Sequence, residues 1–491
     1  MRKRKVYSVK DTMLFFRRKM YALVTLGLGI FLFVSCANDG FDSDEKFSSD
    51  VVNTTLESPK AEDIVITPSA DGAKVAVKWP VVYGAGGYQF SLYIVDDPNN
   101  PVAVGKENEI IDGCSATRAL EEDTKYKVVV KTMGNTKYNN SDAQASTEVS
   151  YSTLLPTYAT IPNGSDITAY FANNPIPDSA DELAYNLEVG GTYTMSGVVD
   201  FGNHKVTFRG DKINHPKVTY GAAARLCTSA GLKIKFIDFD CSAQDGLAAD
   251  ASFLSLSATP NSAILGTGSY YIITDPIVVQ SCKVTGVKGY IFYNNQKKYC
   301  VKTFLMKNDV FQCNSAQTST AYIYFNKGDG AINDFTAQNS TFYDLSATGN
   351  KYFIQYGSSA RPDRPGFISG SLNFYNNTFY NIANKGQMGN YNSMRSNKVY
   401  FNLAQNIFYN CGSGEVCRRF MGGGTGMITS FSKNSYWYNG AFSTAELTYD
   451  KSNTAIQSEP TFNSAATGDF TVTSADHQTA RCGDPRWLPT E

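Results

Sequence analysis

Short apolar runs separated by polar turns fill most of the chain, and the pattern contains no long amphipathic helix. In residues 75–79 and 88–93 the apolar positions recur at every second residue, which is the period of a half-buried strand. Gly84, Gly86 and Gly87 form a turn between these two runs. Gly, Asn, Ser and Thr fill the gaps between the later runs as well. The pattern therefore predicts an all-β protein with many turns.

The chain has 491 residues, which is too long for a single ordinary core. Residues 58–155 resemble a fibronectin type III domain: Trp79 ends the first alternating run, and residues 120–126 match the L-x-P-x-T-x-Y corner of that family, with Glu122 where proline is usual. The resemblance implies a β-sandwich in which Trp79 packs between the sheets and the Tyr126 hydroxyl ties the corner. Domains of this fold usually act as spacers.

From residue 160 onward the chain repeats. Aromatic residues that follow Asn-rich turns stand at positions 311, 342, 379, 408 and 436, which are 31, 37, 29 and 28 residues apart. A second series of short runs precedes them, at residues 289–293, 321–325, 352–356 and 416–420. A third strand lies between the two series, for example at residues 300–304 and 372–375. Each repeat therefore predicts three short strands that form one coil of a parallel β-helix.

Inward Ile, Val and Phe are expected to form columns between the stacked coils. The recurrent Asn before the third strand tolerates a left-handed backbone and can form an amide ladder from coil to coil. Residues 160–491 resemble the pectate-lyase-like right-handed β-helix. More narrowly, they resemble β-helix modules that follow a fibronectin-like domain in Bacteroidetes surface lipoproteins, and residues 459–487 resemble the closing coil of that group. Such a fold does not by itself define a function.

Residues 1–36 predict a lipoprotein signal peptide. A basic segment precedes an apolar run at 20–34, which is too short to span a bilayer comfortably. Ser35-Cys36 ends the run and resembles a lipobox, with Phe33 where Leu is usual, so Cys36 is the expected lipidation site. An uncleaved membrane anchor is the alternative.

Residues 37–57 form an acidic linker, which resembles the surface-export signal of Bacteroidetes lipoproteins and also fits a solvated, disordered linker. The expected location is the outer membrane, lipid-anchored and facing the cell exterior. Nine cysteines remain after Cys36, and we expect most of them to be small buried hydrophobes, although a Cys411–Cys417 bridge is compatible with the oxidising envelope.

Charge is distributed unevenly along the chain. Residues 37–160 hold 10 Lys and Arg against 19 Asp and Glu, a net charge of −9, whereas residues 276–440 hold 16 against 6, a net charge of +10. A basic body of this kind attracts a polyanion. At the outside of a cell, this favours acidic polysaccharide as the partner over nucleic acid.

Arginine pairs planar carboxylates bidentately and tyrosine stacks on sugar faces. The β-helix run at 321–325, the later runs and the turns after them carry the glycan-binding candidates, which we expect to line one flank: Tyr322, Tyr324, Gln355, Arg361, Arg364, Arg395, Arg418 and Arg419. Under the alternative interpretation, the tyrosines belong to the core and the charges keep a long stack soluble.

Pectate lyases use carboxylates to hold Ca²⁺ and an Arg or Lys to remove a proton. Asp238 and Asp240 point to one face of one expected strand and are weak metal candidates, with Asp245 and Asp250 nearby in the sequence. The R-x-P-x-x-R motif of that family is absent, because the stretch 361–365 has its residue types without its spacing. No catalytic residue is therefore assigned and no cofactor is expected, except Ca²⁺ if the protein is a lyase.

The sequence favours a cell-surface lipoprotein that binds acidic polysaccharide of pectic type during glycan uptake, in association with a sugar-uptake porin complex. A Ca²⁺-dependent polysaccharide lyase on the same fold is the first alternative. A structural or adhesive surface protein is the second.

Overall fold

The computed structural model describes residues 51–490 except residues 348 and 423–425. Cys36, the predicted signal peptide and most of the acidic linker lie outside the described residues. The chain separates into two compact units, Met1–Thr153 and Leu154–Glu491. In the described part of the chain, no helix is long and apolar enough to cross a membrane.

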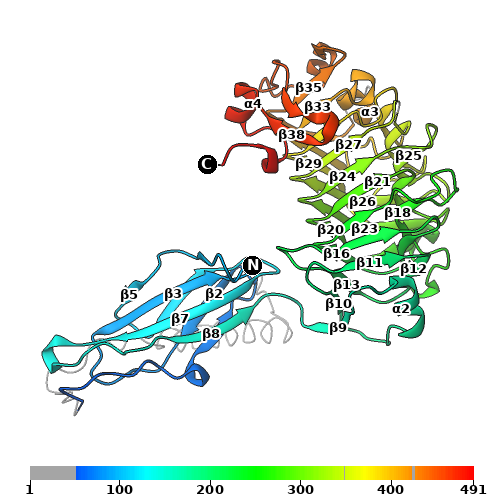
Figure 1. The fold of residues 1–491 in the computed structure, drawn as a ribbon. Helices are drawn as coiled ribbons and strands as arrows, with labels where there is room; N and C mark the ends of the chain where they lie inside the picture. The colour runs from blue at the N-terminus through cyan, green and yellow to red at the C-terminus, as the bar shows by residue number, and fades with distance from the viewer. Residues whose placement is uncertain (1–50, 348, 423–425, 491) are drawn as a thin grey trace, which may run out of the picture. The chain divides into compact units, whose positions relative to one another are not determined.

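The first unit consists of two antiparallel sheets (Figure 1). The smaller sheet has the order β1 (Val65–Pro68), β2 (Lys74–Lys78), β6 (Ser115–Ala119). The larger has the order β4 (Val102–Ala103), β3 (Gly87–Ile94), β7 (Lys125–Met133), β8 (Thr147–Ser152), with β5 (Glu109–Ile111) paired to β3. The 3₁₀ turn η1 (Ala61–Asp63) precedes β1, and η2 (Thr136–Tyr138) lies between β7 and β8.

Both sheets contribute to one core, so the first unit is a β-sandwich. Trp79 is buried within it and stacks on Phe90, with ring centroids 5.6 Å apart. The Tyr126 hydroxyl accepts a hydrogen bond from the backbone N–H of Glu121 at 2.6 Å. The packing expected of Trp79 and the corner bond expected of Tyr126 are therefore both present, while the fibronectin family name stays a prediction.

The second unit is a parallel β-helix with three strands per coil, as predicted (Figure 1). Sheet 1 contains β9 (Thr157–Ile161), β10 (Leu183–Leu187), β13 (Val206–Arg209), β16 (Leu232–Lys235), β20 (Ile277–Gln280), β23 (Tyr299–Lys307), β26 (Ala331–Gln338), β29 (Gly370–Tyr375), β32 (Val399–Ala404) and β34 (Ile428–Ser432), with β19 (Tyr271–Ile273) beside β23. Sheet 2 contains β11 (Thr192–Met195), β14 (Lys217–Tyr220), β17 (Asp238–Asp240), β21 (Lys283–Val287), β24 (Val310–Cys313), β27 (Thr341–Asp344), β30 (Thr378–Tyr380), β33 (Ile407–Tyr409), β35 (Ser435–Tyr438) and the short antiparallel β36 (Ala441–Phe442). Sheet 3 contains β12 (Val198–Asp200), β15 (Arg225–Thr228), β18 (Ser252–Leu256), β22 (Tyr290–Tyr293), β25 (Ala321–Phe325), β28 (Tyr352–Tyr356) and β31 (Gln387–Asn390).

Helices lie near both ends of the stack. Helix α2 (Ile167–Asn173) packs on β11 and β12, and helix α3 (Val416–Met421) packs on β31. Helix α3 replaces the strand predicted at 416–420, because Val416, Cys417, Phe420 and Met421 bury one helical face. The remaining short turns are η3 (Ser262–Ile264), η4 (Thr267–Ser269), η5 (Gly412–Gly414) and η6 (Thr444–Thr448).

The turns between sheets 1 and 2 carry the predicted amide ladder. The Asn377 side-chain amide donates to Asn406 Oδ1 at 2.9 Å, and that of Asn406 donates to Asn434 Oδ1 at 3.0 Å. The left-handed conformation falls on the residue before each rung, for example Gln405 with φ 57°. The recurrent Asn was expected both to adopt the left-handed backbone and to form the ladder. The structure gives the ladder to the Asn and the left-handed backbone to the residue before it. The nine cysteines in the described part of the chain are all free, so the Cys411–Cys417 bridge does not form.

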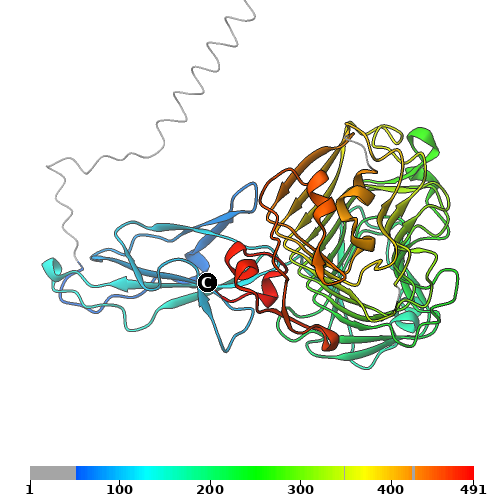
Figure 2. The same cartoon turned by 90° about the horizontal axis from the view of Figure 1, so that it is seen from above.

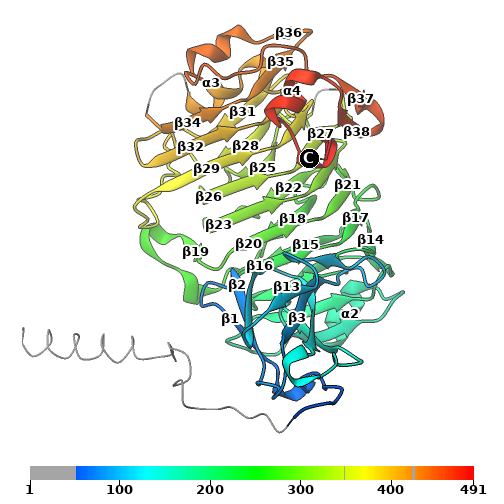
Figure 3. The ribbon, with the colours of Figure 1, turned by 90° about the vertical axis from the view of Figure 1, so that its left-hand side faces the viewer.

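The end of the chain is not a closing coil, which corrects the expectation for residues 459–487. Residues 456–490, termed here the C-terminal strap, leave the last coil and run back along the outside of sheet 2 (Figures 1 and 3). The strap contains β37 (Phe462–Ser464), η7 (Ala465–Thr467), β38 (Asp469–Val472), α4 (Ala475–Ala480) and η8 (Pro485–Trp487). In Figure 2 this red segment lies outside the coils.

Candidate functional site

The outer face of sheet 3 brings together two of the predicted binding residues. Tyr293, Tyr324, Gln355 and Asn390 are paired in register on β22, β25, β28 and β31. Successive coils therefore place these four side chains in one row along the stack. The row is termed here the sheet 3 row.

Tyrosines form the first part of this surface. The Tyr290 ring stacks on Tyr293 and on Tyr324, with centroids 4.5 and 5.3 Å apart. Each ring covers its neighbours, so that only 4% of Tyr290 and 9% of Tyr324 is exposed. Burial also raises the pKa of Tyr290 far above its ordinary value, so this hydroxyl stays neutral. Tyr293 is buried as well, so the three rings form a closed cluster and leave almost no surface for a ligand.

Amides continue the row where the tyrosines end. Gln355 and Asn390 are both partly exposed. An amide side chain both donates and accepts hydrogen bonds, which suits sugar hydroxyls. Tyr352 is also partly exposed, and the Lys351 ammonium lies 5.4 Å from its ring centroid.

Basic turns border the sheet 3 row on both sides. The turns from sheet 3 to sheet 1, at residues 294–298, 326–330, 357–369 and 391–398, contain seven Lys or Arg and two Asp. These cations are Lys297, Lys298, Lys327, Arg361, Arg364, Arg395 and Lys398. The turns from sheet 2 to sheet 3 in the same coils add Lys288, Lys351 and Lys385 and contain no carboxylate. Most of the basic excess of residues 276–440 therefore lies along the two edges of one sheet.

One ion-pair cluster neutralises part of this charge. Asp363 accepts from Arg361 and from Lys398, whose ammonium lies 2.8 Å from Asp363 Oδ2. The hydrogen bond from Lys398, followed by that from Arg361, lowers the pKa of Asp363 to about 2. The cluster therefore keeps a net charge of +1 at neutral pH. Arg364 is exposed and adds a further positive charge to the same turn.

A second ion pair lies beside the tyrosines. Arg225 at the start of β15 contacts Asp250 at 2.7 Å. Both residues line a pocket of 170 Å³, which Asp245 also lines. The pocket places two carboxylates and one guanidinium next to the start of sheet 3.

Four of the predicted binding residues serve the fold in other ways. Tyr322 is fully buried and donates to Asp344 Oδ2 at 2.6 Å, so it cannot contact a glycan. Arg395 is half-buried, and its guanidinium donates to the backbone oxygens of Gly389, Phe420 and Arg419, the last at 2.7 Å. It therefore holds the C-terminal part of α3 against β31.

Arg418 and Arg419 lie on α3 instead of a strand of sheet 3. Both pair with Glu415, and the Arg419 pair is 2.8 Å long. The one carboxylate offsets one of the two positive charges, so the group keeps a net charge of +1. Of the eight predicted residues, Tyr324, Gln355, Arg361 and Arg364 remain on or beside the outer face of sheet 3. Lys351 and Lys385 belong to the basic field that the sequence indicates, whereas sequence reasoning missed the partly exposed Tyr352 and Asn390.

The two weak metal candidates lie on a different sheet. Asp238 and Asp240 are on the outer side of β17 in sheet 2, as the spacing predicted. Asp238 pairs with His215 at 2.9 Å, and Asp240 accepts from the backbone N–H of Ser242 at 2.9 Å. Within the described residues, no group of three His, Cys, Asp or Glu side chains is placed to hold a metal ion.

Three family models match parts of the chain, and each describes a domain of unknown function. DUF4992 matches residues 9–190, DUF4957 residues 191–345 and DUF5123 residues 372–487. No curated protein matches.

Two solved structures resemble the chain. The PL6 family alginate lyase AlyGC is 12% identical with a TM-score of 0.36, over 63% of this chain and 45% of the lyase, so the chain spans less than half of that enzyme. The pectate lyase PelI from Erwinia chrysanthemi, solved with tetragalacturonic acid, is 8% identical with a TM-score of 0.14, over 62% of this chain and 86% of the lyase.

Proposed function

We propose that the outer face of sheet 3 binds an acidic polysaccharide of pectic type without cleaving it. The observation that carries this proposal is the pair of basic edges on either side of the partly exposed Tyr352, Gln355 and Asn390. The edges together hold ten cations, seven on one side and three on the other, against two carboxylates. The Tyr352 ring and the amides suit sugar rings and hydroxyls, and the lysines and arginines suit uronate carboxylates.

Affinity on such a surface has to come from several contacts. One exposed ion pair contributes about 0–1 kcal/mol, whereas a micromolar complex requires about 8 kcal/mol. A polymer that spans several coils can contact lysines or arginines of each coil. Exposed charges are screened beyond about 8 Å in physiological salt. Binding should therefore weaken steeply as salt increases.

The proposed setting is the outer surface of the cell. Cys36 would carry the lipid anchor to the outer membrane, the first unit would act as a spacer, and the bound glycan would pass to a sugar-uptake porin complex. The N-terminal sequence pattern supports the anchor.

A Ca²⁺-dependent lyase is the second candidate. Asp245 and Asp250 lie beside Arg225 in one small pocket at the start of sheet 3. A lyase of this kind needs carboxylates for Ca²⁺ and an Arg or Lys as the base, and both residue types occur here. The Arg225 guanidinium is held as a cation by its ion pair with Asp250, which disfavours its use as a base for proton abstraction. A lyase would release unsaturated product that absorbs in the ultraviolet, and chelation of Ca²⁺ would stop it.

The test compares polygalacturonate with a neutral glucan at low and high salt. Lys351→Ala/Lys385→Ala and Arg361→Ala/Arg364→Ala should each weaken polygalacturonate binding about tenfold. Lys433→Ala/Lys451→Ala removes two exposed charges elsewhere on the β-helix and serves as the matched control. Equal affinity for the acidic and the neutral polymer would refute the electrostatic proposal, and no binding of either would favour the adhesive alternative.

A further inference from the structure

A pocket of 370 Å³ lies at the end of the C-terminal strap, on the outer side of sheet 2. Its floor includes Lys283 on β21 and Asn308 in the turn before β24. Tyr343 forms one side and Arg486 and Trp487 of the strap form another. Its volume falls within the range of about 300–1,000 Å³ that is typical of small-molecule pockets.

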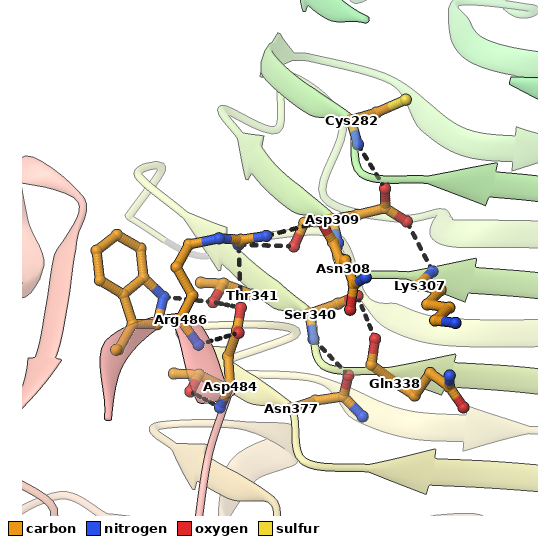
Figure 4. A network of polar contacts seen from close by, with 12 residues as sticks. Cys282, Lys307, Asn308, Asp309, Gln338, Ser340, Thr341, Asn377, Asp484 and Arg486 are labelled. Atoms are coloured by element: carbon orange, nitrogen blue, oxygen red, sulfur yellow. Dashed lines mark hydrogen bonds and ion pairs between the residues drawn. The ribbon is translucent and has the colours of Figure 1, made fainter. Parts of the chain in front are cut away.

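Long-range hydrogen bonds fix the strap that makes this pocket (Figure 4). Buried Asp484 accepts from the Thr341 hydroxyl at 2.8 Å, and the same hydroxyl accepts from the indole N–H of Trp487 at 2.8 Å. Arg486 donates to the backbone oxygen of Asn308 at 2.7 Å. The pocket wall is therefore held in place before any ligand arrives, which lowers the entropy cost of binding.

The lining is cationic. Lys283 and Arg486 carry permanent positive charges, and no carboxylate lines the pocket. Arg486 uses three N–H donations, to Asn308, Asp309 and Asp484, of the five that a guanidinium offers. Lys283 is exposed and makes no ion pair or hydrogen bond with the described part of the chain. Donors on both side chains thus remain for a carboxylate.

A hydroxyl-bearing ring fits the other walls. His215 Nδ1 lies 2.9 Å from Asp238 Oδ1, and because a carboxylate only accepts, Nδ1 carries the hydrogen and Nε2 is left for a hydrogen bond with a ligand hydroxyl. Trp487 and Tyr343 provide aromatic surface. Gly468, with φ 86°, lets the wall approach the Tyr343 hydroxyl, because a Cβ there would lie 2.8 Å from it.

We propose that this pocket binds a single hexuronate unit, with its carboxylate on Lys283 and Arg486 and its ring against Trp487. It lies on sheet 2, so it is a site separate from the sheet 3 row and does not rest on the proposed function. The acid is favoured over a neutral sugar by the two cations and over inorganic anions by the aromatic wall.

The experiment titrates the intact protein with D-galacturonate and, as the matched neutral sugar, D-galactose, by calorimetry and by tryptophan fluorescence at low salt. Galacturonate should bind at least tenfold more tightly than galactose. Lys283→Ala should weaken galacturonate about fivefold and leave galactose unchanged, and Lys283→Arg should retain most of the affinity. Thermal melting of each variant verifies folding, which exposed Lys283 should not affect.

Lys351→Ala/Lys385→Ala separates the two sites. Monosaccharide binding should be unchanged in that variant even where polygalacturonate binding is weakened. Equal binding of the two sugars, or a Lys283→Ala variant with wild-type affinity for galacturonate, would overturn the pocket proposal and leave the sheet 3 proposal standing. Loss of galacturonate binding in the sheet 3 variant would also overturn it, because the monosaccharide would then bind on sheet 3.

Discussion

Asn406 is the middle rung of the amide ladder, and its replacement by alanine tests whether the ladder holds the coils together. Its side-chain nitrogen donates to the backbone oxygens of Phe374 and Ala404, at 2.7 and 3.1 Å, and to Asn434 Oδ1 at 3.0 Å. Its side-chain oxygen accepts from the backbone and side-chain nitrogens of Asn377, at 3.1 and 2.9 Å. All five bonds disappear in Asn406→Ala.

The decrease in the free energy of unfolding can be estimated from the hydrogen bonds that remain in the variant. The buried backbone N–H of Asn377 loses its acceptor, and an orphaned buried donor costs about 1–3 kcal/mol. The Asn377 side chain keeps its bond to Ala337, and Asn434 Oδ1 keeps the backbone N–H of Asn406, so the other losses are partial. We therefore expect Asn406→Ala to lower the free energy of unfolding of the β-helix by about 3 kcal/mol.

Urea denaturation followed by circular dichroism measures this change. The matched control is Asn397→Ala in the turn before β32, which is exposed and makes no side-chain hydrogen bond with the described part of the chain. The control should change the free energy by less than about 0.5 kcal/mol. If both variants shift the transition equally, the ladder does not contribute as its geometry implies.

Two further predictions concern the anchor and the last coil. Cys36→Ala should release the protein from membranes, and protease added to whole cells should digest the wild type; unchanged membrane association of the variant would contradict lipidation. Burial raises the pKa of Glu446, whose carboxylate caps the first backbone N–H groups of α3, from 4.5 to about 7. Its contribution to stability should therefore be complete below pH 4.5 and lost as pH rises through 7. The free energy of unfolding, measured by urea denaturation, should change with pH by about 3 kcal/mol less in Glu446→Gln than in the wild type. If the pH profiles of the two proteins are parallel, the pKa of Glu446 is not raised as described.

The fold could be predicted because its contacts repeat. Each coil buries the same columns, so the Asn turns and apolar strands recur at a visible period. Tyr322 shows why the face of a strand was harder to assign. Near the corner between sheets 2 and 3, adjacent residues both belong to the core, as do Ile291 and Phe292 on β22 and Phe353 and Ile354 on β28. Strict alternation therefore fails at the start of these strands.

Features outside the repeat left weaker signals. The spacing of Val416 with Phe420 and of Cys417 with Met421 is helical and could have revealed α3. No repeat in the sequence indicates the contacts of the strap, because Arg486 donates to the backbone oxygen of Asn308, which lies 178 positions away in the sequence. The pocket was therefore not accessible without the structure, whereas the pairing of Glu415 with Arg418 and Arg419 follows from helical spacing once α3 is recognised.

Two rows of aromatic side chains lie on the outer faces of sheets 2 and 3, and they differ in what covers them. On sheet 2, Tyr380 stacks on Tyr409 with centroids 5.0 Å apart, and the strap covers this row. Phe470 lies 5.4 Å from Tyr380, and Phe462 lies 5.9 Å from Tyr409, so these rings pack against the chain itself. On sheet 3, Tyr290, Tyr293 and Tyr324 are buried, and Tyr352 is partly exposed beside Lys351. A polymer on sheet 3 would therefore meet Tyr352, Gln355 and Asn390, whereas on sheet 2 the strap covers the aromatic row up to the pocket where it ends.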